Sequence, residues 1–361
     1  MKILYDHQIF CLQQYGGVSR YHIELLRELN KYNDVSVDIP TLFNKNSYLA
    51  EYGHSKAYCV KSKWIDRIIK LINRVYTFIC VIIKQYDIIH PTWYAPYIHI
   101  FCKKKIIITI HDMIHEIYGE SNIKDIMLKK RAIYESDAII AISENTKNDI
   151  LKIYPDIPRN KIKVIYHGTN HLPDSKKPER FDIPERYILF VGKRDGYKNA
   201  EVLIKAMAYV VQKRKDIILF MVGGGSFDKK ELNMINTLKL ENNVIQNNVS
   251  DAELAYLYEN AICFVYPSKY EGFGFPLLEA FDNNCPVISS NASCLPEIGG
   301  DAALYFEPND QDELIHQIES MISNEELREK YKLLGKLRTK MFSWENTAKN
   351  TYELYKKVLN D

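Results

Sequence analysis

The chain has few cysteines, and none has the spacing of a redox motif or a zinc site. Seven cysteines occur among 361 residues, and no two of them form a C-x-x-C pair. An odd count without such spacing argues against a disulfide framework as well as a zinc site. We therefore expect reduced thiols with mostly structural roles.

Long apolar segments and low-complexity stretches are also missing. The longest apolar run without a charge extends from Val75 to Ile83, which is too short to span a bilayer, and no charged-then-apolar leader opens the chain. The sequence therefore predicts a cytoplasmic protein. An apolar content of 46% is ordinary for a globular protein, and 361 residues suit about two domains.

Two common nucleotide-binding motifs are absent. Gly223-Gly224-Gly225-Ser226 stands between a predicted strand and a predicted helix but lacks the G-K-[ST] ending of a P-loop, so we expect a tight turn. The glycines of Gln14-Tyr15-Gly16-Gly17-Val18-Ser19-Arg20 open a predicted helix without forming G-x-G-x-x-G, which gives an NAD site little support.

Candidate metal ligands are few. His111 and His115 are four residues apart, but zinc binding with that spacing needs a helix and a third ligand, and neither is visible. Asp310-Gln311-Asp312 is formally a D-x-D motif, yet the following Glu313-Leu314-Ile315 has a helical pattern, so helix N-capping explains the motif better. We expect no bound metal.

The net charge of +2 conceals an uneven distribution. Residues 1–175 hold 24 Lys and Arg against 18 Asp and Glu, whereas residues 176–361 hold 24 against 28. Basic residues gather at positions 103–105, at positions 129–131 and along one helical stretch at Lys61, Lys63, Arg67, Lys70 and Arg74. Such a face can meet anionic lipid or an anionic acceptor, and ordinary solvated surface is the alternative. No nucleic-acid partner is expected.

Short β-rich runs alternate with helical ones through the whole chain. The runs Ile106–Ile110 and Ile217–Val222 are apolar almost without interruption, which is typical of parallel strands covered on both faces. Strands are expected at residues 2–6, 87–90, 105–111, 138–143, 163–167, 187–192, 217–223, 243–247, 261–267, 286–290 and 303–306. This alternation predicts two Rossmann-like domains with a cleft between them, joined by the polar, proline-rich residues 171–184.

The most informative segment is Tyr270-Glu271-Gly272-Phe273-Gly274-Phe275-Pro276-Leu277-Leu278-Glu279. It places two carboxylates eight positions apart around a glycine-bearing turn that leads into a helix. Gly272 and Gly274 let the backbone approach a ligand, so the amides at the helix start can face a diphosphate. Glu271 and Glu279 can accept hydrogen bonds from hydroxyls. The segment indicates a sugar-nucleotide site, and a plain surface turn is the alternative.

A second segment brings cations to the edge of the same predicted sheet. The strand that ends at Gly192 is followed by Lys193-Arg194-Asp195-Gly196-Tyr197-Lys198-Asn199, and ligands of open α/β sheets bind where strands end. We assign Arg194 and Lys198 to the diphosphate, because they can stabilise the charge that builds on a departing nucleotide. A basic surface loop is the alternative.

These motifs together resemble a known family. Glu271 and Glu279 match the E-x7-E pattern of retaining family 4 glycosyltransferases with the GT-B fold, and the resemblance runs from Gly16-Gly17 to the terminal helical segment. It implies two Rossmann-like domains facing a central cleft. Residues 1–170 would bind the acceptor, residues 185–343 would bind the donor, and a terminal helix at 344–361 would return to the first domain.

The resemblance also implies roles for single residues. Four would act in the chemistry: His111, Arg194, Lys198 and Glu271. Seven would bind the donor: Gly17, Val249, Gly272, Phe273, Gly274, Phe275 and Glu279. Among these, His111 would contact the donor sugar, Glu271 would hold sugar hydroxyls, Glu279 would hold the ribose, and the backbone near Val249 would touch the nucleobase.

The implied reaction moves a hexosyl group from a nucleotide-diphosphate sugar to a glycan or lipid-linked glycan acceptor, with retention and without a metal or other cofactor. The overall pattern resembles bacterial mannosyltransferase-type enzymes of O-antigen or capsule assembly, notably in Tyr5-Asp6-His7, Tyr15-Gly16-Gly17-Val18-Ser19-Arg20-Tyr21 and Tyr197-Lys198-Asn199. We therefore expect GDP-mannose as the first donor and a UDP-linked sugar as the next. No nucleophile is evident, which favours a front-face route. Two other functions stay open: a GT-B sugar-nucleotide epimerase and a catalytically silent nucleotide-sugar binding protein.

Overall fold

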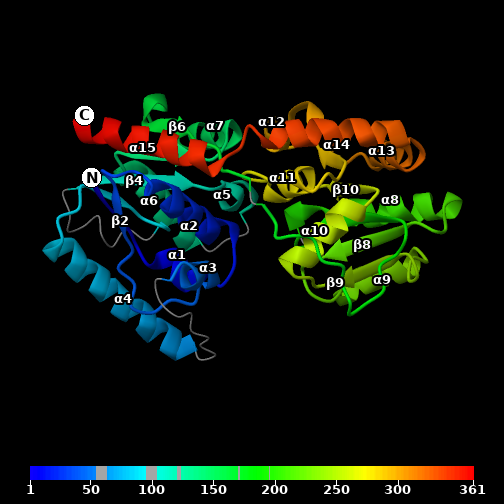
Figure 1. Cartoon of the computed structure of the whole chain (residues 1–361), viewed down its shortest axis with the longest axis horizontal. Coiled ribbons are helices and arrows are strands. Elements are labelled where there is room, and N and C mark those ends of the chain that lie inside the picture. The colour runs from blue at the N-terminus through cyan, green and yellow to red at the C-terminus, as the bar shows by residue number, and fades with distance from the viewer. Residues whose placement is uncertain (54–62, 95–103, 120–122, 170, 195) are drawn as a thin grey trace. The chain divides into compact units, whose positions relative to one another are not determined.

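The chain divides into two compact units, each described here by itself (Figure 1). A computed structural model describes residues 1–53, 63–94, 104–119, 123–169, 171–194 and 196–361. The first unit holds residues Met1–Gly168 and Ser343–Asp361, and the second holds Thr169–Phe342. The polar segment 171–184, expected as a linker, therefore clusters with the second unit.

The first unit is built on a parallel sheet with the order β2-β1-β3-β4-β5-β6, which is a doubly wound, flavodoxin-like order. Its strands are β1 (Lys2–Tyr5), β2 (Ser36–Asp38), β3 (Ile88–His90), β4 (Lys105–Ile110), β5 (Ala138–Ala141) and β6 (Ile162–Val164). Its helices are α1 (Gln8–Leu12), α2 (Gly17–Leu29), α3 (Ser47–Glu51), α4 (Lys63–Ile83), α5 (Ile114–Tyr118), α6 (Ile123–Glu135), α7 (Glu144–Ile153) and α15 (Trp344–Asn360).

Successive side chains of the strands enter two different cores. Ile107 belongs to the apolar cluster that contains helix α2 residues, whereas Ile106 and Ile108 belong to the cluster on the opposite face. This alternation follows from the two-residue repeat of a strand. It explains why the strand sequences are apolar throughout, since both faces of the sheet are covered.

The terminal helix α15 returns to the first unit, as predicted. The hydroxyl of buried Tyr355 is hydrogen-bonded to Tyr5 Oη at 3.1 Å and to His90 Nδ1 at 2.6 Å. Gly168 lies against the start of the helix so closely that a Cβ there would stand 2.3 Å from the Trp344 nitrogen. The helix is thus held by buried polar contacts as well as by apolar packing.

The second unit is built on a parallel sheet with the order β12-β11-β10-β7-β8-β9. Its strands are β7 (Tyr187–Val191), β8 (Ile218–Val222), β9 (Val244–Asn247), β10 (Cys263–Tyr266), β11 (Val287–Ser290) and β12 (Ala303–Phe306). Its helices are α8 (Ala200–Lys213), α9 (Lys229–Thr237), α10 (Asp251–Asn260), α11 (Phe275–Asp282), α12 (Leu295–Gly299), α13 (Gln311–Ser323) and α14 (Glu325–Thr339). This is the Rossmann order, which reverses between β7 and β10, and ligands of open α/β sheets bind beyond the strand ends at such a reversal.

In the basic cluster expected on the surface at positions 129–131, Lys130 and Arg131 are exposed but Lys129 is buried. Lys129 is only 3% exposed, and its Nζ lies 2.9 Å from a Glu116 carboxylate oxygen. Arg131 donates to Glu135 at 2.6 Å. Lys129 is therefore neutralised by Glu116, a partner that tertiary packing supplies, whereas Arg131 pairs with Glu135 at the i,i+4 spacing of a helix.

No helix in the part of the chain that the structure describes is both long and apolar enough to cross a membrane.

Candidate active site

Lys198 and Glu271 meet at the point where the strand order of the second unit reverses. Lys198 Nζ donates to both carboxylate oxygens of Glu271, at 2.7 and 3.0 Å, and the two side chains are 20% and 10% exposed. The Glu271 backbone is held on both sides: its N–H donates to Ser293 Oγ at 2.9 Å, and its carbonyl accepts from Cys294 Sγ at 3.2 Å. A cation and a carboxylate are thus fixed together at the sheet edge.

The glycine-bearing turn after Glu271 leads into helix α11 as predicted. Gly274 has φ +94°, and a Cβ there would stand 3.0 Å from a Leu295 methyl group, so only glycine suits the position. Phe273 is buried, and its ring lies 5.3 Å from that of Phe275. The N-terminus of α11, the positive end of its dipole, therefore begins four residues after the Glu271 carboxylate. Glu279, within the same helix, is half-buried.

Arg194 is engaged inside its own unit. Its Nε donates to Glu231 at 2.6 Å, and its terminal nitrogens donate to the carbonyls of Gly223 at 2.5 Å and Gly225 at 2.9 Å. Its side chain is only 3% exposed, and the guanidinium lies 4.9 Å from the centre of the Phe227 ring. Arg194 therefore holds the turn after β8, and a diphosphate would reach it only if some of these bonds open. Its assignment to the diphosphate stays a prediction.

The turn that Arg194 holds is the expected glycine turn. Gly223, Gly224 and Gly225 all have left-handed backbone angles, with φ of +88°, +73° and +75°. A Cβ on Gly224 would stand 2.7 Å from a terminal nitrogen of Arg194. The turn therefore needs glycine because its backbone wraps closely around the Arg194 guanidinium. The glycines thus serve a side chain of the protein, a role different from that of the glycines of a phosphate loop.

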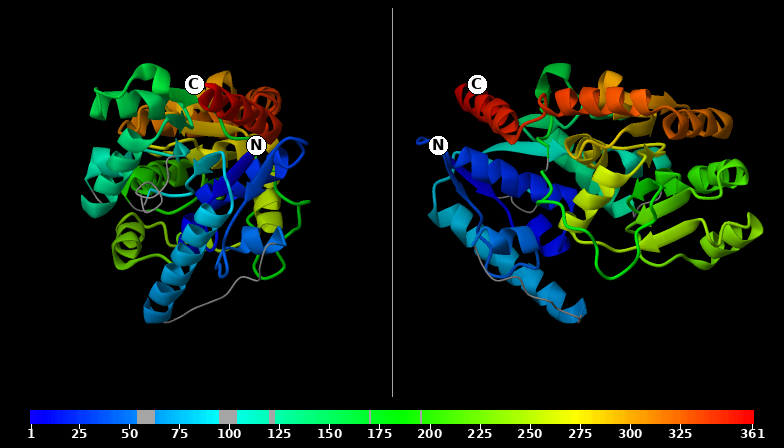
Figure 2. Two further views of the ribbon diagram at one scale, coloured as in Figure 1. Left: turned by 90° about the vertical axis from the view of Figure 1, so that its left-hand side faces the viewer. Right: turned by 45° about the vertical axis from the view of Figure 1, so that its right-hand side comes forward.

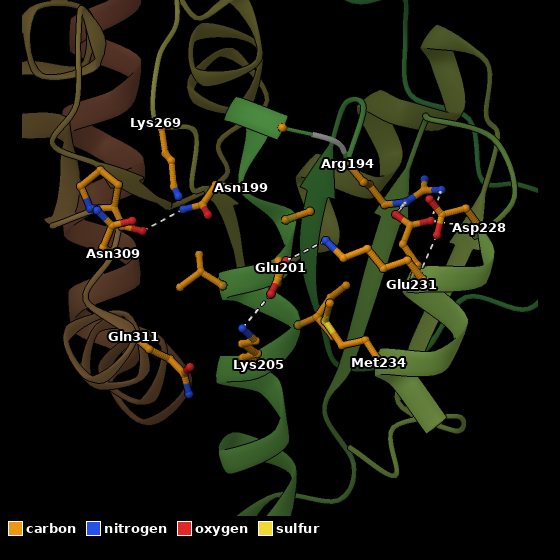
Figure 3. A pocket seen from close by; sticks show the side chains of 16 residues that line it. Arg194, Asn199, Glu201, Lys205, Asp228, Glu231, Met234, Lys269, Asn309 and Gln311 are labelled. Carbon is orange, nitrogen blue, oxygen red and sulfur yellow. Dashed lines mark hydrogen bonds and ion pairs between the residues drawn. The ribbon is translucent and has the colours of Figure 1, made fainter. Parts of the chain in front are cut away.

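A cavity of about 480 Å³ adjoins the loop after β7 (Figure 3). Arg194 and Asn199 line it, and Glu201 extends along it with Lys205 at 2.7 Å. Asn199 has a left-handed φ of 56°, and its amide donates to the carbonyls of Pro267 and Pro308, which ties three strand ends together. Of the residues predicted for the chemistry or for the ribose, Arg194 lines the cavity, whereas Lys198, Glu271 and Glu279 are not among its described lining residues.

In the first unit, His111 follows β4 and is buried among aromatic rings. Ring centres lie at 5.2 Å for Tyr21, 5.7 Å for His167 and 6.2 Å for His22. Burial lowers the pKa of His111 to about 4, against the opposing charge of Asp112. The imidazole is therefore neutral near pH 7, and its Nε2 has no hydrogen-bond partner. A neutral imidazole of this kind can form a hydrogen bond with a ligand hydroxyl, but it carries no charge that could stabilise a charged ligand.

Sequence reasoning missed the other buried histidines around His111. His90 Nδ1 is hydrogen-bonded to the Tyr355 hydroxyl, and His90 Nε2 is hydrogen-bonded to Thr109 Oγ1 at 2.9 Å. Thr109 Oγ1 is also hydrogen-bonded to Tyr21 Oη at 3.0 Å. Burial lowers the pKa of His90 to about 3. His90 ends β3 and His167 follows β6, so their positions at strand ends were a usable signal.

Gly17 and Val249 lie at helix starts, as predicted, although no ligand contact is tested. Gly17 is the first residue of α2. At the neighbouring Gly16, any side chain would collide with Gln13, because a Cβ there would stand 2.3 Å from Gln13 Oε1. Val249 precedes Ser250, which caps α10 through a reciprocal capping box with Glu253. Both positions leave main-chain groups near a positive helix end.

The capping interpretation of the D-x-D sequence is confirmed. Asp310 precedes α13, and its carboxylate accepts a hydrogen bond from the Glu313 N–H at 2.9 Å. Among the residues described, no group of three or more His, Cys, Asp or Glu is arranged to hold a metal ion.

Comparisons with known proteins identify the class. The family model described as "Glycosyltransferase Family 4" matches residues 15–171, and the model described as "Glycosyl transferases group 1" matches residues 173–337. The chain is 27% identical over 369 residues to the O-antigen chain mannosyltransferase B of Escherichia coli, covering 94% of this chain and 96% of that protein.

Solved structures agree on the fold. Sucrose-phosphate synthase from Thermosynechococcus elongatus superposes with a TM-score of 0.76 at 19% identity, covering 99% of both chains. The Anabaena protein HepE, in complex with UDP and glucose, gives 0.74 at 17% identity and covers 99% of this chain and all of its own. The chain is therefore a glycosyltransferase with the GT-B fold. Within that class it belongs to family 4.

Proposed function

We propose that the chain is a retaining hexosyltransferase that takes mannose from GDP-mannose, with a UDP-linked sugar as the second candidate donor. The acceptor would be the hydroxyl of a glycan or lipid-linked glycan in the assembly of a bacterial O-antigen or capsule-type polysaccharide. Similarity to O-antigen chain mannosyltransferase B over nearly the whole chain supports the sugar and the pathway class. The complex of HepE with UDP and glucose supports the second donor.

One observation carries the proposal: the ion pair of Lys198 and Glu271 beside the start of α11. The carboxylate can accept hydrogen bonds from sugar hydroxyls, and the ammonium can neutralise a phosphate oxygen. The pair is also preorganised, because Glu271 is fixed through its backbone and holds Lys198 in place before any ligand arrives. Preorganised charges are the most effective way to stabilise charge that develops during a reaction.

The proposed step breaks the bond between the anomeric carbon and a diphosphate oxygen. Negative charge grows on the leaving diphosphate, where Lys198 and the positive end of α11 stabilise it, joined by Arg194 once some of its bonds to Glu231 and the glycine turn open. The acceptor oxygen bonds to the same face of the anomeric carbon, and its proton passes to the departing phosphate oxygen. The route needs neither a side-chain nucleophile nor a metal, and we propose that no cofactor takes part.

The remaining assignments keep the roles that the family resemblance implies. Glu279 would hold the ribose hydroxyls, and His111 would exchange a hydrogen bond with the donor sugar. Main-chain groups would meet the sugar, phosphates and base at Gly17, Val249, Gly272, Phe273, Gly274 and Phe275. We place the reaction in the cytoplasm, at the inner face of a membrane, because a lipid-linked acceptor would be presented there.

A thermal-shift titration with GDP, UDP, dTDP and the corresponding nucleotide-diphosphate sugars tests the donor site. A ligand that binds only the folded state raises the melting temperature by mass action. We expect one nucleotide to act selectively, GDP first. No shift with any of them at millimolar concentration would remove the donor assignments of Arg194, Lys198 and Glu279.

Incubation of the protein with the nucleotide sugar alone, without an acceptor, distinguishes a glycosyltransferase from an epimerase and from a catalytically silent binding protein. A transferase without acceptor gives slow hydrolysis at most, whereas an epimerase yields a new sugar nucleotide. A silent binding protein gives neither product, with or without an acceptor glycan. Turnover only with an acceptor supports the proposal, and a new sugar nucleotide without one contradicts it.

A further inference from the structure

Helix α4 presents its apolar side to solvent. Nine of its apolar side chains are exposed: Trp64, Ile65, Ile68, Leu71, Ile72, Val75, Ile79, Ile82 and Ile83. Most of them recur at spacings of three and four residues and so share one face. The exposed fraction is 69% at Trp64, 60% at Leu71 and 73% at Ile83. An ordinary surface helix turns such a face towards the core, so the orientation of α4 is reversed.

Polar side chains on the opposite face fix this orientation. Asn73 and Thr77 are fully buried. Asn73 Oδ1 accepts from the backbone N–H groups of Leu42 and Phe43 at 3.0 and 3.1 Å, and Thr77 Oγ1 donates to the Pro40 carbonyl at 3.0 Å. Rotating the helix to bury its apolar face would break these bonds and leave buried polar groups unpaired, which is costly. The outward apolar face is therefore specified by the fold.

The apolar face continues onto the loop beside the helix. Leu42 and Phe43 are 46% and 43% exposed, and a pocket of about 370 Å³ is lined by Leu42 together with Leu71, Ile72, Val75, Tyr76 and Ile79. Figures 1 and 2 show α4 running along the edge of the first unit, and the side of the helix that joins the core does so through Cys80. A contiguous exposed apolar patch on a helix marks a surface that meets a membrane or a protein.

The charges along α4 favour lipid with anionic headgroups. The helix carries four basic residues and one acidic residue, Asp66, which pairs with Lys70 at 2.6 Å. Arg67 and Arg74 are exposed and seven residues apart, so both lie on the same border of the apolar face. Long arginine side chains at such a border reach headgroup phosphates while neighbouring apolar groups enter the acyl boundary. Trp64 adds a side chain that prefers the membrane interface.

We infer that the exposed apolar face of α4 lies in the surface of an anionic membrane, with Leu71, Ile72 and Val75 below the headgroups and Arg67 and Arg74 on the phosphates. This inference rests on the membrane location put forward with the proposed function and specifies it. The contact differs from the basic face expected from the sequence, because the basic residues border the contact instead of forming it. It would bring the enzyme to the surface where a lipid-linked acceptor resides.

Sedimentation of the full chain with vesicles tests the inference. We expect binding to vesicles of phosphatidylcholine mixed with phosphatidylglycerol and much weaker binding to phosphatidylcholine alone. The double variant Leu71→Gln, Val75→Gln should weaken binding about tenfold or more, because two apolar side chains leave the membrane. Arg67→Gln should weaken it about fivefold. The matched control Leu333→Gln, Leu337→Gln, on exposed leucines of α14 in the second unit, should leave binding unchanged.

Two results would overturn the inference. The first is no sedimentation with phosphatidylglycerol vesicles. The second is a combination of results: the parent chain does not bind vesicles, it forms a dimer in analytical ultracentrifugation, and the double variant Leu71→Gln, Val75→Gln abolishes that dimer. The apolar face of α4 would then bind a second copy of the chain.

A nucleotide thermal shift on the same preparations separates this inference from the proposed function. A chain that shifts with a nucleotide but ignores vesicles contradicts only the membrane face. A chain that binds phosphatidylglycerol vesicles but shifts with no nucleotide supports the membrane face and removes the proposed donor site.

Discussion

The two parallel sheets end in different chemistry. At the sheet edge of the second unit the polar side chains are ion-paired, Lys198 with Glu271 and Arg194 with Glu231. At the corresponding edge of the first unit, neutral rings and hydroxyls such as those around His90 and His111 gather beside one buried carboxylate, Asp6, which accepts hydrogen bonds from Thr92 and has no ion-pair partner among the described residues. Two sheets of related topology thus surround their strand ends with different electrostatic environments: ion pairs in the second unit, and mainly neutral hydrogen-bonding groups in the first.

The difference follows from what each edge can stabilise. Paired charges at a sheet edge are held ready for a ligand that brings its own charge, as a diphosphate does. Buried neutral imidazoles have lost their charge to desolvation and offer only hydrogen bonds, which suit hydroxyls. The contrast divides the proposed work between a unit that handles phosphate charge and a unit that handles sugar hydroxyls.

Removing Lys198 should have the largest effect. Lys198→Ala deletes the cation paired with Glu271, and we expect turnover to fall about 10²- to 10³-fold, as for other single charge-stabilising groups. Steady-state kinetics with the selected donor measure the loss. Lys229→Ala, an exposed lysine on α9 in the same unit, is the matched control. Unchanged turnover in Lys198→Ala would refute the assignment of charge stabilisation to this edge.

Arg194→Ala should lower turnover about 10²-fold and also destabilise the protein. The substitution leaves the largely buried Glu231 carboxylate without its cation, which costs about 3 kcal/mol in the free energy of unfolding. Urea unfolding and kinetics on the same sample measure both quantities. Normal turnover would take Arg194 out of the mechanism, whereas normal stability would refute its clamp on the turn after β8.

Acid should weaken the first unit. Burial holds the pKa of His90 at about 3 and that of His111 at about 4, below the ordinary value of 6.5, so the unfolded chain binds more protons below pH 6.5. Stability is then present above pH 6.5 and is lost as pH falls, by up to about 1.4 kcal/mol per pH unit for each histidine.

Tryptophan fluorescence can follow this loss, because Trp64, Trp93 and Trp344 all lie in the first unit. Urea unfolding between pH 8 and pH 5 should show a flat region above pH 7 and a decline below pH 6.5. A free energy of unfolding that stays level down to pH 5 would contradict the neutral buried cluster.

Glu279→Gln should have the smallest effect. Loss of the carboxylate should weaken nucleotide binding about tenfold and change turnover less, because a charged hydrogen bond to the ribose acts in the ground state as well as the transition state. Isothermal titration and kinetics separate the two quantities. Glu259→Gln, on an exposed position of α10, controls for lost charge. A defect confined to turnover would contradict the ribose assignment.

The strands were largely predictable because their evidence is local. Apolar runs between turn residues marked eleven of the strands, and Gly274 was correctly placed at the start of a helix. β2 was missed, since its three residues form a partly exposed strand without an apolar run. The buried histidines were missed as well: no spacing along the chain joins His22 to the others, and the strand-end positions of His90 and His167 were not used.

The sequence by itself determined the elements, the family and most candidate site residues, because propensity, periodicity and short motifs depend on neighbouring residues. Tertiary structure alone decided the partners. Glu271 meets Lys198 because β7 and β10 are adjacent, and Arg194 is occupied by a glutamate 37 positions away. It also decided that α4 turns its apolar side outward, through Asn73 and Thr77. Desolvation, pairing and exposure are properties of non-local packing, so a sequence read residue by residue does not contain them.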